Sequence, residues 1–255
     1  QRQMCIRDSD STLYEYYQRC QEYLLEPVVL NMSDTLFRMA GERQDERMQA
    51  VAIATQLDYY YFQGTNEDSV IHYTNKVKEF AKATHQPKYY YFAWANRLIT
   101  YYLKTSRTNI ALYEVQNMLK EAQEEDDKTG LSRCYNIMSQ IYTIKRFDSM
   151  AFEWRLKEIE LTEKYKIENY NISQTYAQIA NYYINQKKQK EALAAVEKAI
   201  ATANSSTQQI SAKLEFVNYY SKFGDFQAAE KLLKECQAAF EQDKRLESIK
   251  KRLYN

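Results

Sequence analysis

The sequence predicts an all-α fold built from repeated helical hairpins, and its composition gives two reasons. Only four glycines and two prolines occur among 255 residues, far fewer than strands joined by tight turns would need. The chain is instead rich in Glu, Lys, Gln, Ala and Leu, which lose little rotamer freedom in a helix. Hydrophobic residues make up 45% of the chain, so a sizeable core can form.

The third reason is a repeat marked by tyrosine, which occurs 24 times. Doublets ending in tyrosine recur at intervals of 37 to 42 residues, and a small residue follows nine positions after each. The second members of the doublets, here called marker residues, are Tyr60, Tyr102, Tyr142, Tyr183 and Tyr220, and the small residues are Ser69, Ala111, Ala151, Ala192 and Ala229. Five copies of one sequence pattern at similar intervals predict a repeat protein.

Each unit of the repeat has the pattern of two helices. The segment 176–183, YAQIANYY, has apolar residues at i, i+3, i+4 and i+7, which is one face of a helix. After a turn, the segment 191–200 places Ala192, Val196, Ala199 and Ile200 on one face of a second helix. Gly64 and Gly224 fall four residues after a marker residue, where a left-handed turn is expected. Pro27 and Pro87 can each open a helix.

These residues resemble the tetratricopeptide (TPR) repeat. The resemblance rests on Tyr183, Ala192 and Ala199, and on Tyr220, Gly224, Asp225, Phe226 and Ala229 in YYSKFGDFQAAEKLL. It implies a right-handed α-α superhelix, a TPR-like solenoid, of about six helix pairs. The intervals exceed the TPR period of roughly 34 and approach the HEAT period of roughly 40, so a longer TPR variant is favoured and a HEAT-like repeat is the alternative.

The resemblance covers residues 11 to 250, and we expect a single repeat domain over 10–255. Its units are expected at 11–42, 45–84, 87–126, 129–167, 171–204 and 207–243, the first of them from its two helical patterns alone. Residues 1–9 lack any periodic pattern and resemble translated adapter sequence, so we expect a non-native leader there and a chain that is a fragment.

The segment 88–104, KYYYFAWANRLITYYLK, is the most aromatic part of the chain. Three consecutive tyrosines cover a wider arc than a one-sided amphipathic helix buries. In a repeat, the first helix of a pair is packed by its own second helix and by the neighbouring pair. We therefore expect these rings to be buried, with each hydroxyl reaching water or a backbone carbonyl.

Catalytic and ligand motifs are scarce. The 35 basic and 34 acidic residues nearly balance, which gives no indication of a nucleic-acid or membrane partner. Two histidines, four cysteines without a CxxC pair and four scattered glycines supply neither a metal site nor a phosphate-binding loop. We expect no cofactor, no metal and no enzymatic activity in this chain, and we expect the cysteines to be isolated core thiols.

A concave face is the better candidate for function, because solenoids present one long surface to partners. In the TPR family this surface is lined by the first helix of each pair, which suggests a protein or peptide partner here. We therefore select candidate residues by their positions relative to the marker residues, and we add Arg133 for its charge. The candidates are Asp58, Asn96, Thr100, Lys104, Arg133, Asn136, Gln140, Asn181, Asn185, Asn218 and Lys222. Side-chain amides can donate to and accept from an extended peptide. The alternative is that the row is only solvated surface.

The tyrosine-rich units also resemble, in overall texture, the N-terminal TPR region of Bacteroidetes sensor histidine kinases. The resemblance lies in LDYYYFQGTNEDS (57–69), QPKYYYFAW (86–94), RLITYYLK (97–104) and EIELTEKYKIENYN (158–171). It implies a sensory region on the periplasmic side of the membrane, a homodimer in the full-length protein, and a basic segment (244–253) leading toward the membrane. The alternative is a stand-alone cytoplasmic TPR regulator, which suits the unpaired cysteines better.

Overall fold

The computed structural model describes residues 11–242, which form helices joined by short turns with no strand among them. The all-α prediction is therefore confirmed. The expected leader at residues 1–9, with Cys5, and the basic segment 244–253 lie outside the described residues. The chain divides into two compact units, Gln1–Lys145 (unit 1) and Arg146–Asn255 (unit 2), which are described separately.

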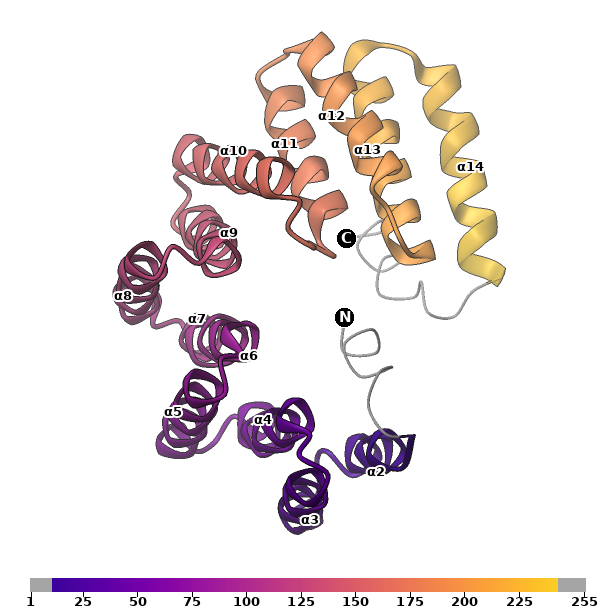
Figure 1. The fold of residues 1–255 in the computed structure, drawn as a ribbon. Helices are drawn as coiled ribbons and strands as arrows, with labels where there is room; N and C mark the ends of the chain where they lie inside the picture. The colour runs from indigo at the N-terminus through magenta and orange to yellow at the C-terminus, as the bar shows by residue number, and fades with distance from the viewer. Residues whose placement is uncertain (1–10, 243–255) are drawn as a thin grey trace. The chain divides into compact units, whose positions relative to one another are not determined.

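Unit 1 consists of helical hairpins. Its helices are α2 (Ser11–Glu22), α3 (Val28–Glu42), α4 (Glu46–Gln63), α5 (Glu67–Ala83), α6 (Pro87–Ala93), the π-helix η1 (Trp94–Ile99), α7 (Thr100–Lys104), α8 (Thr108–Glu124) and α9 (Lys128–Ile144). Figure 1 shows that α2, α4, α6–α7 and α9 lie on the inner side of the curved row of helices in this unit, while α3, α5 and α8 lie on its outer side. The first helix of each pair is thus an inner helix.

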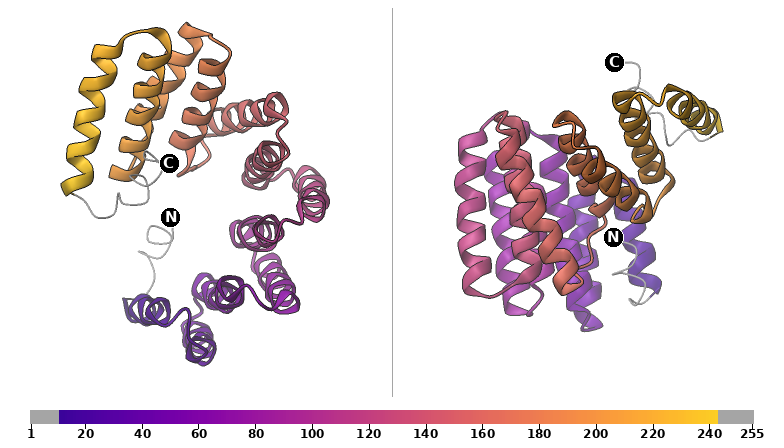
Figure 2. Two further views of the ribbon diagram at one scale, coloured as in Figure 1. Left: turned by 180° about the vertical axis from the view of Figure 1, so that it is seen from behind. Right: turned by 90° about the horizontal axis from the view of Figure 1, so that it is seen from above.

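Unit 2 contains α10 (Asp148–Tyr165), α11 (Ile172–Asn185), α12 (Gln189–Ala201), α13 (Ser206–Phe223) and α14 (Phe226–Gln242). The helices α11 to α14 lie side by side (Figure 2), and α11 also contacts α13 directly. This arrangement encloses the apolar faces of two hairpins between their helices.

The turns between paired helices confirm the predicted left-handed position. The residue four places after each marker residue has a positive φ: Gly64 (69°), Ser106 (60°), Arg146 (64°), Lys187 (57°) and Gly224 (91°). At the first turn, the N–H of Gly64 itself donates to the Tyr60 carbonyl at 3.1 Å. In three other turns the backbone N–H of the next residue donates to the marker carbonyl, as Lys188 does to Tyr183 at 2.9 Å. This is the Schellman arrangement, which satisfies carbonyls at the end of a helix.

The small residues nine places after the markers are buried in four of the five hairpins, and the exception is Ser69. One extra residue separates the left-handed Gly64 from the start of α5, compared with the other turns. Val70 therefore takes the buried position, fully covered, while Ser69 is half-buried at the helix start. The sequence pattern placed Ser69 one residue too early because it could not show this insertion.

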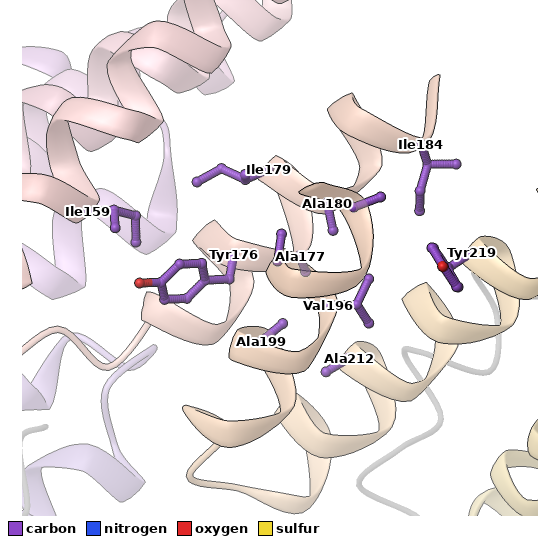
Figure 3. Close-up of a cluster of buried hydrophobic side chains, with 12 residues drawn as sticks. Ile159, Tyr176, Ala177, Ile179, Ala180, Ile184, Val196, Ala199, Ala212 and Tyr219 are labelled. Atoms are coloured by element: carbon purple, nitrogen blue, oxygen red, sulfur yellow. The ribbon is translucent and has the colours of Figure 1, made fainter. Parts of the chain in front are cut away.

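The core of unit 2 combines small residues with larger ones such as Tyr176, Ile179 and Tyr219 (Figure 3). Ala180 of α11 and Ala192, Val196 and Ala199 of α12 are fully buried together. Ile200, which we expected on the same face, is exposed because it lies at the edge of the apolar stripe. A comparable cluster in unit 1 joins α2, α3 and α4, and its members are Leu13, Tyr17, Cys20, Val29, Leu36, Ala40, Met48 and Ala52.

The aromatic segment of unit 1 is buried as predicted, with Tyr90 and Tyr91 essentially inaccessible. The expectation for their hydroxyls was wrong in detail, since the Tyr91 hydroxyl donates to Glu125 Oε2 at 3.1 Å. The ring of Tyr91 lies against Gly130 of α9, where an added Cβ would come within 2.6 Å of a ring carbon. A glycine in the first turn of α9 thus makes room for a tyrosine on α6.

Candidate functional site

The candidate residues occupy the first helices of the pairs, and their exposure differs between the units. In unit 1, Asp58 is buried at 1% exposure, and Asn96, Thr100, Arg133 and Asn136 are half-buried. The exposed candidates are Lys104 and Gln140 in unit 1 and Asn181, Asn185, Asn218 and Lys222 in unit 2. Side chains at equivalent positions of the repeat are therefore covered in some hairpins and accessible in others.

Asp58 on α4 is part of a buried ion pair with Arg97 of η1, whose side chain is 11% exposed. The Arg97 guanidinium also lies over aromatic rings, 4.7 Å from the ring centre of Phe92 and 4.9 Å from that of Tyr61. Charge pairing and cation–π contacts together hold Arg97 between two inner helices. Asp58 is thus a structural partner of this arginine.

The π-helix η1 determines how its residues reach their neighbours. The Thr100 hydroxyl donates to the carbonyl of Ala95, five residues earlier, at 2.9 Å. Asn96 accepts a hydrogen bond from Arg133 Nη1 of α9 at 3.1 Å, while the adjacent Arg97 reaches α4. Consecutive residues of η1 therefore connect to the inner helices on both sides. Single π-helical turns often occur at functional sites.

Arg133 on α9 is charged but lies in a largely covered position. Its Nε is buried and has no hydrogen-bond partner among the described residues, and its guanidinium lies 5.9 Å from the ring centre of Phe92. Burial lowers the pKa of Arg133, and the nearby Asp127 carboxylate opposes this effect. An arginine keeps its proton under these conditions, so a positive charge remains here.

Lys104 on α7 lies beside exposed aromatic surface. Its Nζ is 4.1 Å from the ring centre of Tyr61 and 5.8 Å from that of Phe62. Phe62 itself is 47% exposed. The inner side of unit 1 thus offers a cation and an accessible ring next to each other.

The amide candidates form short hydrogen-bonded pairs along their own helices. Gln140 Nε2 donates to Asn136 Oδ1 at 2.7 Å on α9, and Asn185 Nδ2 donates to Asn181 Oδ1 at 3.2 Å on α11. Each pair spans four residues, one helical turn. Both pairs retain amide groups that point away from the hairpin core, because Gln140, Asn181 and Asn185 are exposed.

Unit 2 offers a neutral row instead of a charged cluster. The helix α11 carries no charged residue, and α13 carries only Lys213, Glu215 and Lys222. The side chain of Asn218 hydrogen-bonds Glu215, whose pKa is raised by burial in spite of that bond. The exposed polar side chains on α11 and α13 are therefore mostly amides.

Arg97 and Phe92 were not among the residues that we selected from the sequence. Arg97 lies 39 residues after Asp58, which is close to one repeat interval and was the available signal. Its neighbour Asn96 was selected in its place, because the register counts α-helical turns and η1 is a π-helix.

Other kinds of site are not evident in residues 11–242. No cluster of three or more His, Cys, Asp or Glu there could hold a metal ion. No described helix is both long and apolar enough to cross a membrane. Cys20, Cys134 and Cys236 are buried and unpaired, as predicted, and burial raises the pKa of Cys20 to about 11. A polar hollow beside Arg43, Asp45 and Gln86 includes none of the candidate residues.

The arrangement of paired helices with buried small residues defines a TPR-like helical repeat, and the comparison with solved structures supports this class. BtubC (BKLC) from P. vanneervenii superposes with a TM-score of 0.65 at 14% identity over 91% of this chain and 93% of that protein. The apo form of RapI also gives 0.65 at 14% identity, over 93% of this chain and 66% of RapI.

A third similar structure is the TPR-like repeat region of a kinesin light chain from Podosopora anserina. It has a TM-score of 0.55 at 14% identity, covering 78% of this chain and 97% of that one. No protein-family model matches the sequence, and no curated protein matches it. The similarity is therefore one of fold.

Proposed function

We propose that this chain is a non-catalytic TPR-like module that binds a protein or peptide through the first helices of its hairpins. The observation that carries the proposal is the row of exposed amides and cations on these helices, which the second helices leave uncovered. Exposed groups of this kind can bind an extended backbone, because an amide both donates and accepts. In unit 2 the row is Asn181, Asn185, Asn218 and Lys222.

The proposal is tested by selecting binders from a display library of random short peptides. Selected peptides are then titrated against the wild-type chain and against a variant with Asn181→Ala and Asn218→Ala. Loss of two peptide-facing hydrogen bonds should weaken binding by about tenfold or more. The free energy of unfolding should fall by about 1 kcal/mol, because Asn218 gives up its hydrogen bond to the buried Glu215 carboxyl group, and circular dichroism checks that the variant folds.

The matched control replaces two exposed amides on the second helices, Gln189→Ala on α12 and Gln227→Ala on α14. This variant should bind as the wild type does. If the Asn181 and Asn218 variant also binds normally, the row is solvated surface and has no part in recognition.

For the biological setting, we propose the sensory region of a bacterial two-component sensor histidine kinase, folded as one repeat domain and dimeric in the full-length protein. The support is the resemblance of the tyrosine-rich units, such as residues 57–69 and 86–94, to such regions. A repeat whose units contact only their neighbours can change curvature when a ligand bridges several of them, which suits a sensor. A stand-alone cytoplasmic regulator is the second candidate, favoured by three buried, unpaired cysteines.

These two settings are separated by fusing a reporter that is active only after export behind residue 255 of the full gene product. Activity is expected for the sensor. A reporter that works only when it is retained in the cytoplasm would exclude the sensor and leave the cytoplasmic regulator.

A further inference from the structure

Two inner segments of unit 1, α6 to α7 and α9, carry only positive charges, whereas the inner helices α2 and α4 each carry two acidic residues and one arginine. Residues 87–104 and 128–144 carry five cations, Lys88, Arg97, Lys104, Lys128 and Arg133, and no Asp or Glu. The outer helix α8 has the opposite balance, with three glutamates and one lysine. Unit 1 is therefore positive on one side of its hairpins, although the whole chain has a net charge of only +1.

Only part of this positive charge is neutralised within the unit. Arg97 is paired with Asp58, and Lys128 with Asp126. Arg133 donates to the neutral Asn96, and within the described residues neither Arg133 nor Lys104 has a carboxylate partner. Three cations, Lys88, Lys104 and Arg133, thus have no carboxylate partner within the described residues, and Lys104 and Arg133 lie beside the rings of Phe62 and Phe92.

We propose that these inner helices bind an acidic segment of a protein partner, with Lys104 and Arg133 attracting its Asp and Glu side chains. This inference rests on the proposed function and specifies its partner. Complementary charge steers such a segment toward the site and orients it there.

The neighbouring groups favour a peptide over other anions. The exposed ring of Phe62, next to Lys104, gives an apolar side chain of the peptide a surface to contact. Peptide carboxylates are spaced along a chain and can reach the separate cations one at a time.

The test uses labelled peptides of one length in which Asp and Glu are retained or replaced by Asn and Gln. The Asp and Glu form should bind more tightly, and its affinity should fall as salt is raised. Lys104→Glu should weaken binding of the acidic peptide by at least about fivefold at low salt. Lys190→Glu is the control, since Lys190 is an exposed lysine on α12, a second helix outside the proposed binding row; its effect should stay below about twofold.

Arg133→Gln gives an independent measurement, with circular dichroism checking that the variant folds. Equal losses from Lys104→Glu and Lys190→Glu would overturn the inference, because they would show a response to net charge alone. A single-stranded oligonucleotide that displaces the acidic peptide at lower concentration would overturn it in favour of nucleic acid. If library selection yields peptides without acidic residues, the inference fails while the proposed function stands; if it yields no binder, the proposed function fails as well.

Discussion

The two units use the same repeat position for different purposes. Two residues before the marker, unit 1 has Asp58, which is buried in an ion pair with Arg97, while unit 2 has Asn181 and Asn218, which are exposed. The difference arises from the neighbours: η1 brings an arginine onto α4, and α11 has no charged residue to offer. Register in a repeat therefore identifies the helix face, and the adjacent hairpin decides whether that face is covered.

The cores of the two units also differ, although both bury tyrosines: Tyr90 and Tyr91 in unit 1, and Tyr176 and Tyr219 in unit 2. Unit 1 buries tyrosine and tryptophan, with Trp94 donating to Glu114 at 2.8 Å and Tyr91 filling the space beside Gly130. Unit 2 brings its helices together through Ala180, Ala192 and Ala199. Large rings need specific polar partners and space, whereas alanines need only close approach.

The largest expected effect is a loss of stability when the buried ion pair of unit 1 is broken, compared with an exposed ion pair of unit 2. Asp58→Ala should destabilise the chain by about 3 kcal/mol, because it leaves Arg97 without its carboxylate in a covered position. In unit 2, Glu163→Ala should cost less than about 1 kcal/mol, since Glu163 and Lys198 are both about half exposed. Chemical denaturation of the two variants measures the difference. Similar losses would show that the two ion pairs contribute equally.

The second prediction concerns the aromatic core of unit 1. Alanine is a better helix former than glycine, yet Gly130→Ala should destabilise by about 1 to 3 kcal/mol, because the new methyl group would collide with the Tyr91 ring. Gly41→Ala on α3 is the control, since its methyl group would meet only the flexible side chain of Gln49. That variant should be neutral or up to about 1 kcal/mol more stable. Equal melting temperatures would mean that Tyr91 can move aside.

The third prediction applies the same reasoning to the alanine core of unit 2. Ala192→Leu should cost about 1 to 2 kcal/mol, because Ala192 is fully buried among close neighbours. Ala194→Leu, the same change at an exposed position of α12, should stay within about 0.5 kcal/mol. Lys198 would be a poor control, because its ammonium binds Glu163 at 2.8 Å. Comparable thermal melting of the two variants would contradict the assigned helix face.

The sequence predicts the hairpins well because their signals are local. The marker tyrosines, the left-handed residue at Gly64 or Gly224, and the small residue at Ala192 all lie within one pair of helices. The candidate site is harder to predict, because its partners come from neighbouring hairpins. The pairing of Asp58 with Arg97 depends on the π-helix, and no local pattern of residues 94–99 indicates that conformation.

The smallest expected effect concerns Glu215, a buried carboxyl group on α13, which packs against the uncharged helix α11. Burial raises its pKa, and its Oε2 is buried without a hydrogen-bond partner among the described residues. Because the folded-state pKa lies above the unfolded one, Glu215 lowers stability at neutral pH, and stability recovers as pH falls through the folded-state pKa. Glu215→Gln should therefore raise the free energy of unfolding by roughly 1 kcal/mol at pH 7, and this gain should disappear in acid.

Glu163→Gln is the control with the opposite sign. Hydrogen bonds from Lys198 and Tyr176 lower the pKa of Glu163, so this carboxylate stabilises the fold at neutral pH and loses its contribution as pH falls through the lowered pKa. The Glu163→Gln variant should therefore be slightly less stable than the wild type at pH 7 and should approach it in acid. Urea denaturation between pH 4 and pH 8 compares the two variants. If both show the same trend with pH, Glu215 ionises as a solvated group does, and its burial does not affect stability.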